Sequence, residues 1–327
     1  MRATYEVQSG TPELVLTRRI AKPIDKVWAA LTIPARLADW MGVEWLSDPA
    51  TPLSEGARFD YRFANTDMVS EGRVLRFEPP RVLEHSWFEN QPPANVVRWA
   101  LEPDGEGCIL TLTHRFGMVD DAPRTAAGWT MILDALARSF GEAPEAGGDW
   151  HAVRDRYASD FGPEATRDGR RLKDGEVSIL RFERVLSASP TAVWDALTTP
   201  EGLARGLQAQ AVVDGAAGGR FHLLLGGGSS RVDGVITRWA PPALLEYTWP
   251  EGAANGDSLV TFALEPMDEG RTRLTLTHRL TAGGDLQGFA AGWHWRLDCL
   301  DDALVGRGRP FDRQRFGVLQ KVYAATL

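Results

Sequence analysis

Two histidines occupy the same place in two copies of one short motif, and they are the side chains best suited to proton transfer. His114 lies in Leu112-Thr113-His114-Arg115, and His278 lies in Leu276-Thr277-His278-Arg279. Each histidine shares the alternation of the leucines, so we expect it to face inward with them. A buried imidazole beside a cavity could act as a general base or orient a ligand. The alternative is a core histidine that hydrogen bonds to a neighbouring backbone carbonyl or tyrosine.

His85 and Tyr247 also occupy matching inward positions, and each offers a polar tip in an apolar wall. Such a tip could fix the orientation of a bound molecule, or it could be a core polar group with a local partner. Other inward aromatic side chains could line a pocket for a flat, apolar ligand or could simply fill the core. They are Trp40, Phe59, Tyr61, Trp87, Trp99 and Trp129 in the first copy, and Phe221, Trp249, Phe262 and Trp293 in the second.

The two copies are not expected to bind alike, because the second has a thinner aromatic wall. Trp40 and Tyr61 are expected nearest the entrance, where they would meet solvent or ligand. The second copy has Gly206 in place of Trp40 and Leu223 in place of Tyr61. The exchange of His85 for a tyrosine likewise argues against one reaction performed in both copies.

Other residue patterns with chemical potential favour structural interpretations. Glu84 and Glu246 follow the outward phase of their strands, which predicts a solvated sheet face rather than an acid/base pair. The glycine-rich run 226–230 lies between two expected strands and lacks Gly-Lys-Ser/Thr, so it predicts a hairpin turn and not a phosphate loop. Cys108 is expected to be a small buried hydrophobe. The sequence has no His/Cys cluster with metal spacing and no Gly-x-Ser-x-Gly elbow, and it indicates no metal or cofactor.

These paired motifs belong to a repeat that runs through the chain. The segment 27–34, with Val-Trp-x-Ala-Leu-Thr, recurs at 193–200, and Trp28 and Trp194 give the shift of 166 residues. A repeat of this length is a whole domain rather than a solenoid unit of about 20–50 residues. The sequence therefore predicts one domain at 1–166 and a second at 167–327, with the polar stretch 167–175 as a linker.

Each copy predicts the same order of elements. A strand is followed by two short helices, each entered through a proline such as Pro23 or Pro34, and then by strands with alternating apolar residues. Such alternation is typical of an antiparallel sheet with one buried face. A long helix that starts after Gly128 or Gly292 carries an apolar stripe to cover that face. We expect the curved sheet to grip this helix and leave a cavity between them.

Bulk composition restricts the possible partners. The net charge of −8 over 327 residues argues against nucleic acid and against an anionic membrane surface. No apolar run approaches the roughly 20 residues of a membrane span, and the first eleven residues lack an apolar signal core. The two cysteines, Cys108 and Cys299, form no disulfide framework, which favours a reducing cytoplasm.

The pattern resembles the START-like, or Bet v 1-like (SRPBCC), helix-grip superfamily, and more narrowly the homologues of the C-terminal domain of the Hsp90 ATPase activator. The residues that carry the resemblance are 23–34, Trp40, Gly56-x-x-Phe59, Glu71-Gly72 with Pro79-Pro80, Leu112-Thr113-His114, and Gly128-Trp129 with Leu133-Asp134-x-Leu136. The resemblance covers both copies and implies an α+β chain of tandem helix-grip domains. It also implies binding of apolar small molecules in the grip cavity, while some relatives are cyclases or hydratases.

Three functions follow as hypotheses. The first is non-enzymatic binding of a small apolar or aromatic ligand, mainly in the first copy. The second is a cyclase, hydratase or hydrolase that uses His114, with Tyr61 or His85, as acid/base. The third is a chaperone-associated module that uses the outer sheet face or a groove between the copies. The Hsp90 co-chaperone has a separate Hsp90-binding domain, and this sequence contains two copies of the other domain, so Hsp90 activation is not carried over.

Overall fold

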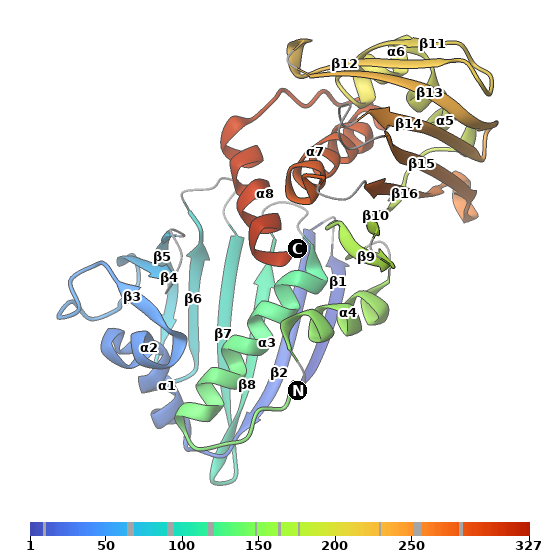
Figure 1. Cartoon of the computed structure of the whole chain (residues 1–327). Helices are drawn as coiled ribbons and strands as arrows, with labels where there is room; N and C mark the ends of the chain where they lie inside the picture. Colours follow the sequence, from blue (N-terminus) through green and yellow to red (C-terminus); the bar gives the residue numbers. More distant parts are fainter. Residues whose placement is uncertain are drawn as a thin grey trace. The chain divides into compact units, whose positions relative to one another are not determined.

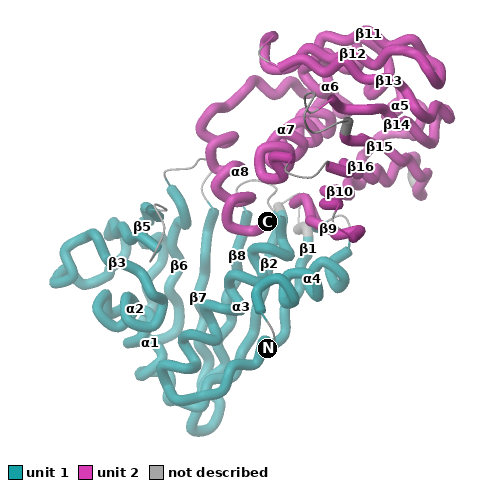
Figure 2. The backbone as a smooth tube through the Cα atoms, in the orientation of Figure 1, with its two compact units in different colours: residues 1–165 teal, residues 166–327 magenta. Residues whose placement is uncertain are grey.

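The chain divides into two units, residues 1–165 and 166–327 (Figure 2). The structure is a computed structural model. It describes residues 1–8, 11–63, 69–89, 95–116, 121–147, 149–162, 165–175, 177–228, 230–250, 257–280 and 284–327. Both units repeat one order of elements, as the two copies of the sequence predict, and each is described by itself.

Unit 1 is an eight-stranded antiparallel sheet with a long helix across one face (Figure 1). The strand order is β1-β2-β8-β7-β6-β5-β4-β3. Its elements are β1 (Arg2–Gln8), β2 (Thr11–Ile20), α1 (Ile24–Thr32), α2 (Pro34–Met41), β3 (Val43–Trp45), β4 (Arg58–Phe63), β5 (Val69–Glu78), β6 (Val82–Trp87), β7 (Asn95–Asp104), β8 (Gly107–Arg115), α3 (Ala122–Ser139) and α4 (Trp150–Phe161).

Unit 2 repeats this architecture, with the strand order β11-β12-β13-β14-β15-β16-β10-β9. Its elements are β9 (Arg170–Asp174), β10 (Val177–Leu186), α5 (Pro190–Thr198), α6 (Pro200–Gly206), β11 (Gln210–Val213), β12 (Arg220–Leu225), η2 (Gly226–Gly228), β13 (Ser230–Ala240), β14 (Leu244–Pro250), β15 (Asp257–Pro266), η3 (Asp268–Gly270), β16 (Thr272–Leu280), α7 (Leu286–Leu304) and α8 (Arg313–Thr326). The turn η2 joins the antiparallel partners β12 and β13, which confirms the predicted hairpin, although Ser229 lies outside the described residues.

The predicted strand phases are confirmed, and they place the aromatic residues on the inner face of each sheet. In β8, Leu110, Leu112 and His114 are buried while the residues between them are partly exposed. His278 is buried at the matching place in β16. Cys108 is fully buried, as its phase predicts. This alternation occurs because the inner face packs against α3 or α7 while the outer face meets solvent.

The long helices begin earlier than predicted. α3 starts at Ala122 and α7 starts at Leu286, so Gly128 and Gly292 lie inside them. The start is set by Asp121 in α3, whose carboxylate accepts a hydrogen bond from the backbone N–H of Arg124 at 2.7 Å. A methyl group added at either glycine would meet no atom within 4 Å, so both face open space.

The first strand of each sheet was also missed by the sequence interpretation. Residues 167–175 were expected to be a linker, but β9 lies within them and pairs with β10. In unit 1, β1 pairs with β2 in the same way. Both strands lie at a sheet edge, and Arg170–Asp174 is so polar that its alternation shows no apolar face.

A buried ion pair ties the second strand of each sheet to its long helix. In unit 1, Arg18 of β2 pairs with Asp134 of α3, and each side chain is only 1 % exposed. The Asp134 carboxylate also accepts the backbone N–H groups of Glu145 at 2.9 Å and Ala146 at 3.1 Å. Burial disfavours the charged form of Asp134, but these hydrogen bonds and Arg18 hold its pKa below the usual value.

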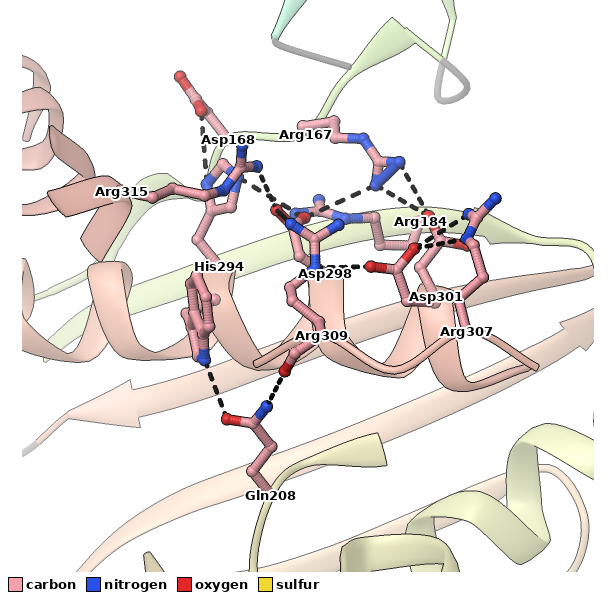
Figure 3. Close-up of polar contacts among 12 residues, drawn as sticks. Arg167, Asp168, Arg184, Gln208, His294, Asp298, Asp301, Arg307, Arg309 and Arg315 are labelled. Atoms are coloured by element: carbon pink, nitrogen blue, oxygen red, sulfur yellow. Dashed lines mark hydrogen bonds and ion pairs between the residues drawn. The ribbon is translucent and has the colours of Figure 1, made fainter. Parts of the chain in front are cut away.

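In unit 2 the matching buried carboxylate, Asp298, is surrounded by several arginines (Figure 3). Asp298 of α7 accepts a hydrogen bond from Arg315 of α8 at 2.7 Å. Arg184, which matches Arg18, lies 3.8 Å from the same carboxylate and is only 3 % exposed. Other cationic or imidazole nitrogens within 4 Å of Asp298 come from Arg167, His294 and Arg309. A side-chain cluster thus replaces the backbone N–H groups that serve Asp134.

Candidate ligand-binding site

The apolar cavity of unit 1 lies beneath the two short helices, and it is small. Its volume is about 20 Å³, enough for one water molecule. The lining comes from α1, α2, β3, the segment 46–57 and strands β4, β6 and β7. The lining residues are Leu31, Leu37, Trp40, Met41, Trp45, Leu53, Phe59, Tyr61, Leu83, His85, Trp87 and Trp99.

The cavity does not lie between the sheet and the long helix, where the sequence placed it. That seam is filled by Trp129 of α3, whose ring centroid is 4.7 Å from that of Trp87 and 5.6 Å from that of Trp99. The Trp129 indole Nε1–H also donates to His114 Nδ1 at 2.8 Å. Trp87 and Trp99 line the cavity and also contact Trp129, so they separate the cavity from the seam between the sheet and α3.

The short helix α2 forms the roof of the cavity. Pro34 occupies its first turn, and Gly42 ends it with a φ of 66°, in the left-handed region that glycine tolerates best. Trp40 is anchored because its Nε1–H donates to the carbonyl oxygen of Ala30 at 2.9 Å. Trp40 and Tyr61 were expected to meet solvent or ligand; both are buried and line the cavity, so only the ligand part of that prediction remains open.

His85 is a fully bonded neutral imidazole in the cavity wall. Its Nδ1 lies 2.8 Å from the carbonyl oxygen of Ser86, and its Nε2 accepts the Trp99 Nε1–H at 3.1 Å. An indole nitrogen can only donate, so the ring proton must sit on Nδ1. Burial lowers the pKa of His85 to about 4, which keeps it neutral near pH 7.

Two other polar atoms in the wall have no partner. The Trp45 indole Nε1–H and the Tyr61 hydroxyl are buried and make no hydrogen bond among the described residues. The hydroxyl of Ser70, opposite Tyr61 across β4 and β5, lies close enough to affect its titration but not in hydrogen-bonding geometry. Burial raises the pKa of Tyr61, and Ser70 offsets this only in part, so the phenol stays protonated. The cavity therefore presents two unused hydrogen-bond donors.

His114 lies outside the cavity wall. It is 3 % exposed, accepts the Trp129 indole N–H, and stacks on Phe116 with ring centroids 4.6 Å apart. A general base must reach its substrate directly or through one water molecule. The packing around His114 matches the core-histidine alternative better than the acid/base role.

The matching region of unit 2 is built from smaller residues. Gly206, Ala211 and Leu223 stand where unit 1 has Trp40, Trp45 and Tyr61. A methyl group on Gly206 would lie 2.9 Å from Leu300 of α7, so α6 packs directly on the long helix. In unit 2, α7 therefore lies against the position that corresponds to Trp40 of unit 1.

The remaining predicted aromatic residues of unit 2 lie in its core, except Trp249, which is partly buried and packs against it. Tyr247 stacks on Phe221 with ring centroids 4.1 Å apart, and burial raises its pKa. Trp293 packs edge-on against Phe262 at 5.8 Å and against Trp249 at 5.4 Å.

His278 of unit 2 lies in a chain of hydrogen bonds. The Trp293 indole Nε1–H donates to its Nδ1 at 3.1 Å, and its Nε2–H donates to Ser258 Oγ at 2.7 Å. The Ser258 hydroxyl in turn donates to the carbonyl oxygen of Trp249 at 3.0 Å. Burial lowers the pKa of His278 to about 3. This arrangement has the structural role that the core-histidine alternative predicts.

Half of the cavity lining was not found from the sequence: Leu31, Leu37, Met41, Trp45, Leu53 and Leu83. Trp45 had a detectable signal, because Val43-Glu44-Trp45 alternates directly after the second short helix. Leu53 lies in a segment without regular secondary structure, where periodicity gives no information.

Other chemical groups on the described part of the chain are engaged in structure. Glu84 accepts a hydrogen bond from Arg115 at 2.7 Å on the outer sheet face, and Glu246 accepts from two threonines. Among the described residues, no three His, Cys, Asp or Glu side chains gather so that they could hold a metal ion. None of the described helices combines the length and apolar character needed to cross a membrane.

The sheet, the paired short helices and the long covering helix define both units as helix-grip domains of the START-like, or Bet v 1-like, class. The model of the Activator of Hsp90 ATPase homolog 1-like protein family matches residues 21–141 and 187–305, once in each unit. The chain belongs to this family.

Similar solved structures include CalU16 from Micromonospora echinospora, with 24% identity over 49% of this chain and 93% of that one, and a TM-score of 0.38. A Bordetella parapertussis protein is 27% identical over 51% of this chain and 94% of that one, with a TM-score of 0.40. DynU16, a putative protein in the dynemicin biosynthetic locus, is 21% identical over 89% of this chain and 98% of that one, with a TM-score of 0.38. No curated protein matches the chain.

Proposed function

We propose that unit 1 binds a small, uncharged, mostly aromatic molecule in the cavity beneath α1 and α2, and that unit 2 does not bind it. The observation that carries this proposal is the pair of unused donors, Trp45 Nε1–H and the Tyr61 hydroxyl, in an otherwise apolar wall. Leaving a buried donor unpaired costs about 1–3 kcal/mol. A ligand that supplies an acceptor would recover that cost.

The ligand class follows from the lining. The aromatic rings of Trp45, Phe59 and Tyr61 lie nearly parallel, with centroids 5.6–6.2 Å apart, and offer flat apolar surfaces. A charged ligand would meet no opposite charge in the wall, because its lining residues are apolar or aromatic apart from neutral His85. A carbonyl or ether oxygen on an aromatic body matches both the rings and the donors.

The cavity must widen to admit such a molecule, since about 20 Å³ holds only water. The roof can move without breaking the sheet. α2 has eight residues, and the segment 46–57 connects β3 to β4 without regular secondary structure. Leu37 and Met41 of α2 and Leu53 of that segment contribute to the lining. An outward shift of these three side chains enlarges the cavity.

Paired ligands test the proposal. Benzophenone and diphenylmethane have the same two rings and differ in the carbonyl acceptor, so calorimetric titration of the full chain with each measures what the donors contribute. We expect saturable binding of benzophenone and binding of diphenylmethane at least about tenfold weaker, since about 1.4 kcal/mol is tenfold in affinity.

Substitutions of the two donor residues show whether they cause the preference for benzophenone over diphenylmethane. Trp45→Phe and Tyr61→Phe should each reduce the preference for benzophenone, because each removes one donor and leaves an aromatic ring at that position. Tyr247→Phe is the matched control, since it removes a buried tyrosine hydroxyl from unit 2 and should change nothing. Absence of binding, or equal affinity for the two ligands, contradicts the proposal.

A further inference from the structure

Phe88, directly after β6, has a backbone conformation that phenylalanine rarely adopts. Its φ is 53°, in the left-handed region that costs conformational free energy for any residue with a Cβ atom. The Phe88 N–H donates to the hydroxyl oxygen of Ser70 at 3.3 Å, and the N–H of Glu89 donates to the carbonyl oxygen of Glu71 at 2.9 Å. Two hydrogen bonds to β5 therefore hold the chain in this turn.

The turn changes the side of the sheet on which the Phe88 ring lies. Trp87 faces inward, so an extended residue 88 would project from the outer face. Phe63, the last residue of β4, shares the inward phase of Phe59 and Tyr61. The Phe88 ring nevertheless stacks on Phe63, with ring centroids 6.2 Å apart, and meets Trp87 edge-on at 5.6 Å. The left-handed backbone thus brings the ring to the inner, aromatic face.

Unit 2 shows that the fold does not require this turn. The repeat aligns Phe88 with Pro250, and proline cannot adopt a positive φ. Pro250 instead extends β14 and pairs with the first residue of β15. The residue that matches Phe63 is Leu225, so unit 2 also lacks the ring on which Phe88 stacks. The strained placement of Phe88 is therefore specific to unit 1.

The Phe88 ring ends an aromatic layer that begins in the apolar cavity. Tyr61 and Trp87 line the cavity, and Phe63 contacts both, with ring centroids 5.5 and 6.0 Å away. Phe88 is only half-buried, so its ring can turn into solvent while Phe63 and Trp87 keep their places. The position that the ring leaves is bordered by the face of Phe63 and by Trp87, which are suitable contacts for another aromatic ring.

We propose that the Phe88 ring occupies a subsite for one ring of the ligand. Unit 1 then accepts aromatic molecules longer than its cavity, because Phe88 turns out and a ligand ring takes over the contacts with Phe63 and Trp87. An extended backbone at Phe88 relieves the strain, which lowers the free energy needed to displace the ring. This inference rests on the proposed binding of an aromatic molecule in the apolar cavity, and it makes that molecule elongated.

Two ligands of different length test the subsite. Benzophenone has two rings, and 4-benzoylbiphenyl has the same carbonyl group and one further ring. Phe88→Gly removes the side-chain ring and tolerates the left-handed backbone, so it empties the subsite without changing the turn. In calorimetric titration of the full chain, we expect this variant to bind 4-benzoylbiphenyl at least about tenfold more tightly than the native chain, because no side chain must be displaced. Its affinity for benzophenone should stay within about threefold of the native value.

Further variants separate the subsite from a general loosening of unit 1. Phe88→Pro copies the residue of unit 2 and should give the same gain, because it also removes the ring. Phe161→Ala removes a half-buried ring of α4 that packs on Tyr5 and Tyr157, and it should change neither affinity. Phe63→Ala, added to Phe88→Gly, should weaken binding of 4-benzoylbiphenyl by about fivefold or more and leave benzophenone unaffected.

The possible results distinguish the subsite from the proposed function. If benzophenone binds but the Phe88 variants leave the affinity for 4-benzoylbiphenyl unchanged, or raise both affinities equally, the subsite is wrong and the proposed function stands. If neither ligand binds the native chain or the variants, the proposed function is wrong and the subsite with it.

Discussion

The buried neutral His85 should make unit 1 lose stability in mild acid. Protonation would place a second N–H on the ring at Nε2, which faces the Trp99 indole N–H at 3.1 Å. Two donors would then oppose each other in a buried site. Burial already lowers the folded pKa to about 4, from a value of about 6.5 in the unfolded chain.

The size of the effect follows from these two pKa values. As pH falls, the unfolded chain binds the proton first, so the stability present above pH 6.5 is lost progressively down to about pH 4. At about pH 4.5, linkage gives a loss of roughly 2–3 kcal/mol from this one histidine. His278 in unit 2 has the same sign of dependence, with a folded pKa of about 3.

The assay is urea unfolding at pH 7 and pH 4.5, compared between the native chain and His85→Tyr. Tyrosine is the residue that unit 2 has at the matching position, Tyr247, and it does not titrate in this range. The variant should lose about 2–3 kcal/mol less than the native chain between the two pH values. His151→Tyr, at an exposed position of α4, should keep the full loss. Equal losses in His85→Tyr and the native chain would mean that protonation of His85 does not destabilise unit 1.

Three further predictions concern the free energy of unfolding, measured in urea near pH 7. Arg18→Met leaves Asp134 buried without its cation and should lower this free energy by about 3–5 kcal/mol. Arg19→Met removes an exposed ion pair with Asp104 and should lower it by about 1 kcal/mol or less. Similar losses in the two variants would mean that the buried pair contributes little. Gly202→Ala should destabilise unit 2, because its methyl group would lie 2.2 Å from the Asp195 carbonyl oxygen. Gly292→Ala faces open space and should raise the free energy of unfolding by about 0.5–1 kcal/mol. Ser258→Ala leaves the His278 Nε2–H unpaired and should cost about 1–3 kcal/mol, and no change would disprove the hydrogen-bond chain.

The strand phases could be predicted because burial imposes a period of two on each strand. Leu110, Leu112 and His114 alternate with polar residues only because one sheet face packs on a helix. The duplicated sequence strengthened this prediction, since both copies show the same phases. The starts of α3 and α7 were predicted too late because the prediction relied on Gly128 and Gly292. The helices in fact begin at the capping residues Asp121 and Asp285, which lie earlier in the sequence.

The position of the apolar cavity could not be derived from periodicity. Six of the aromatic residues expected to line it do so: Trp40, Phe59, Tyr61, His85, Trp87 and Trp99. Strand phase shows that a residue points inward, but it does not show whether a helix or a void lies opposite. Trp129 fills the seam, and the void instead lies beside α2 and the edge strand β3.

The position at which benzophenone binds shows directly whether unit 1 holds a ligand beneath α2. Benzophenone forms covalent bonds to nearby C–H groups under near-ultraviolet light, so irradiation of the full chain followed by peptide mass spectrometry marks the site. We expect labelling of α2 and the neighbouring segment, at residues such as Leu37, Met41 or Leu53. We also expect that labelling to be lost when flavone is present in excess. Labelling confined to unit 2, or spread over the surface without competition, would contradict binding beneath α2.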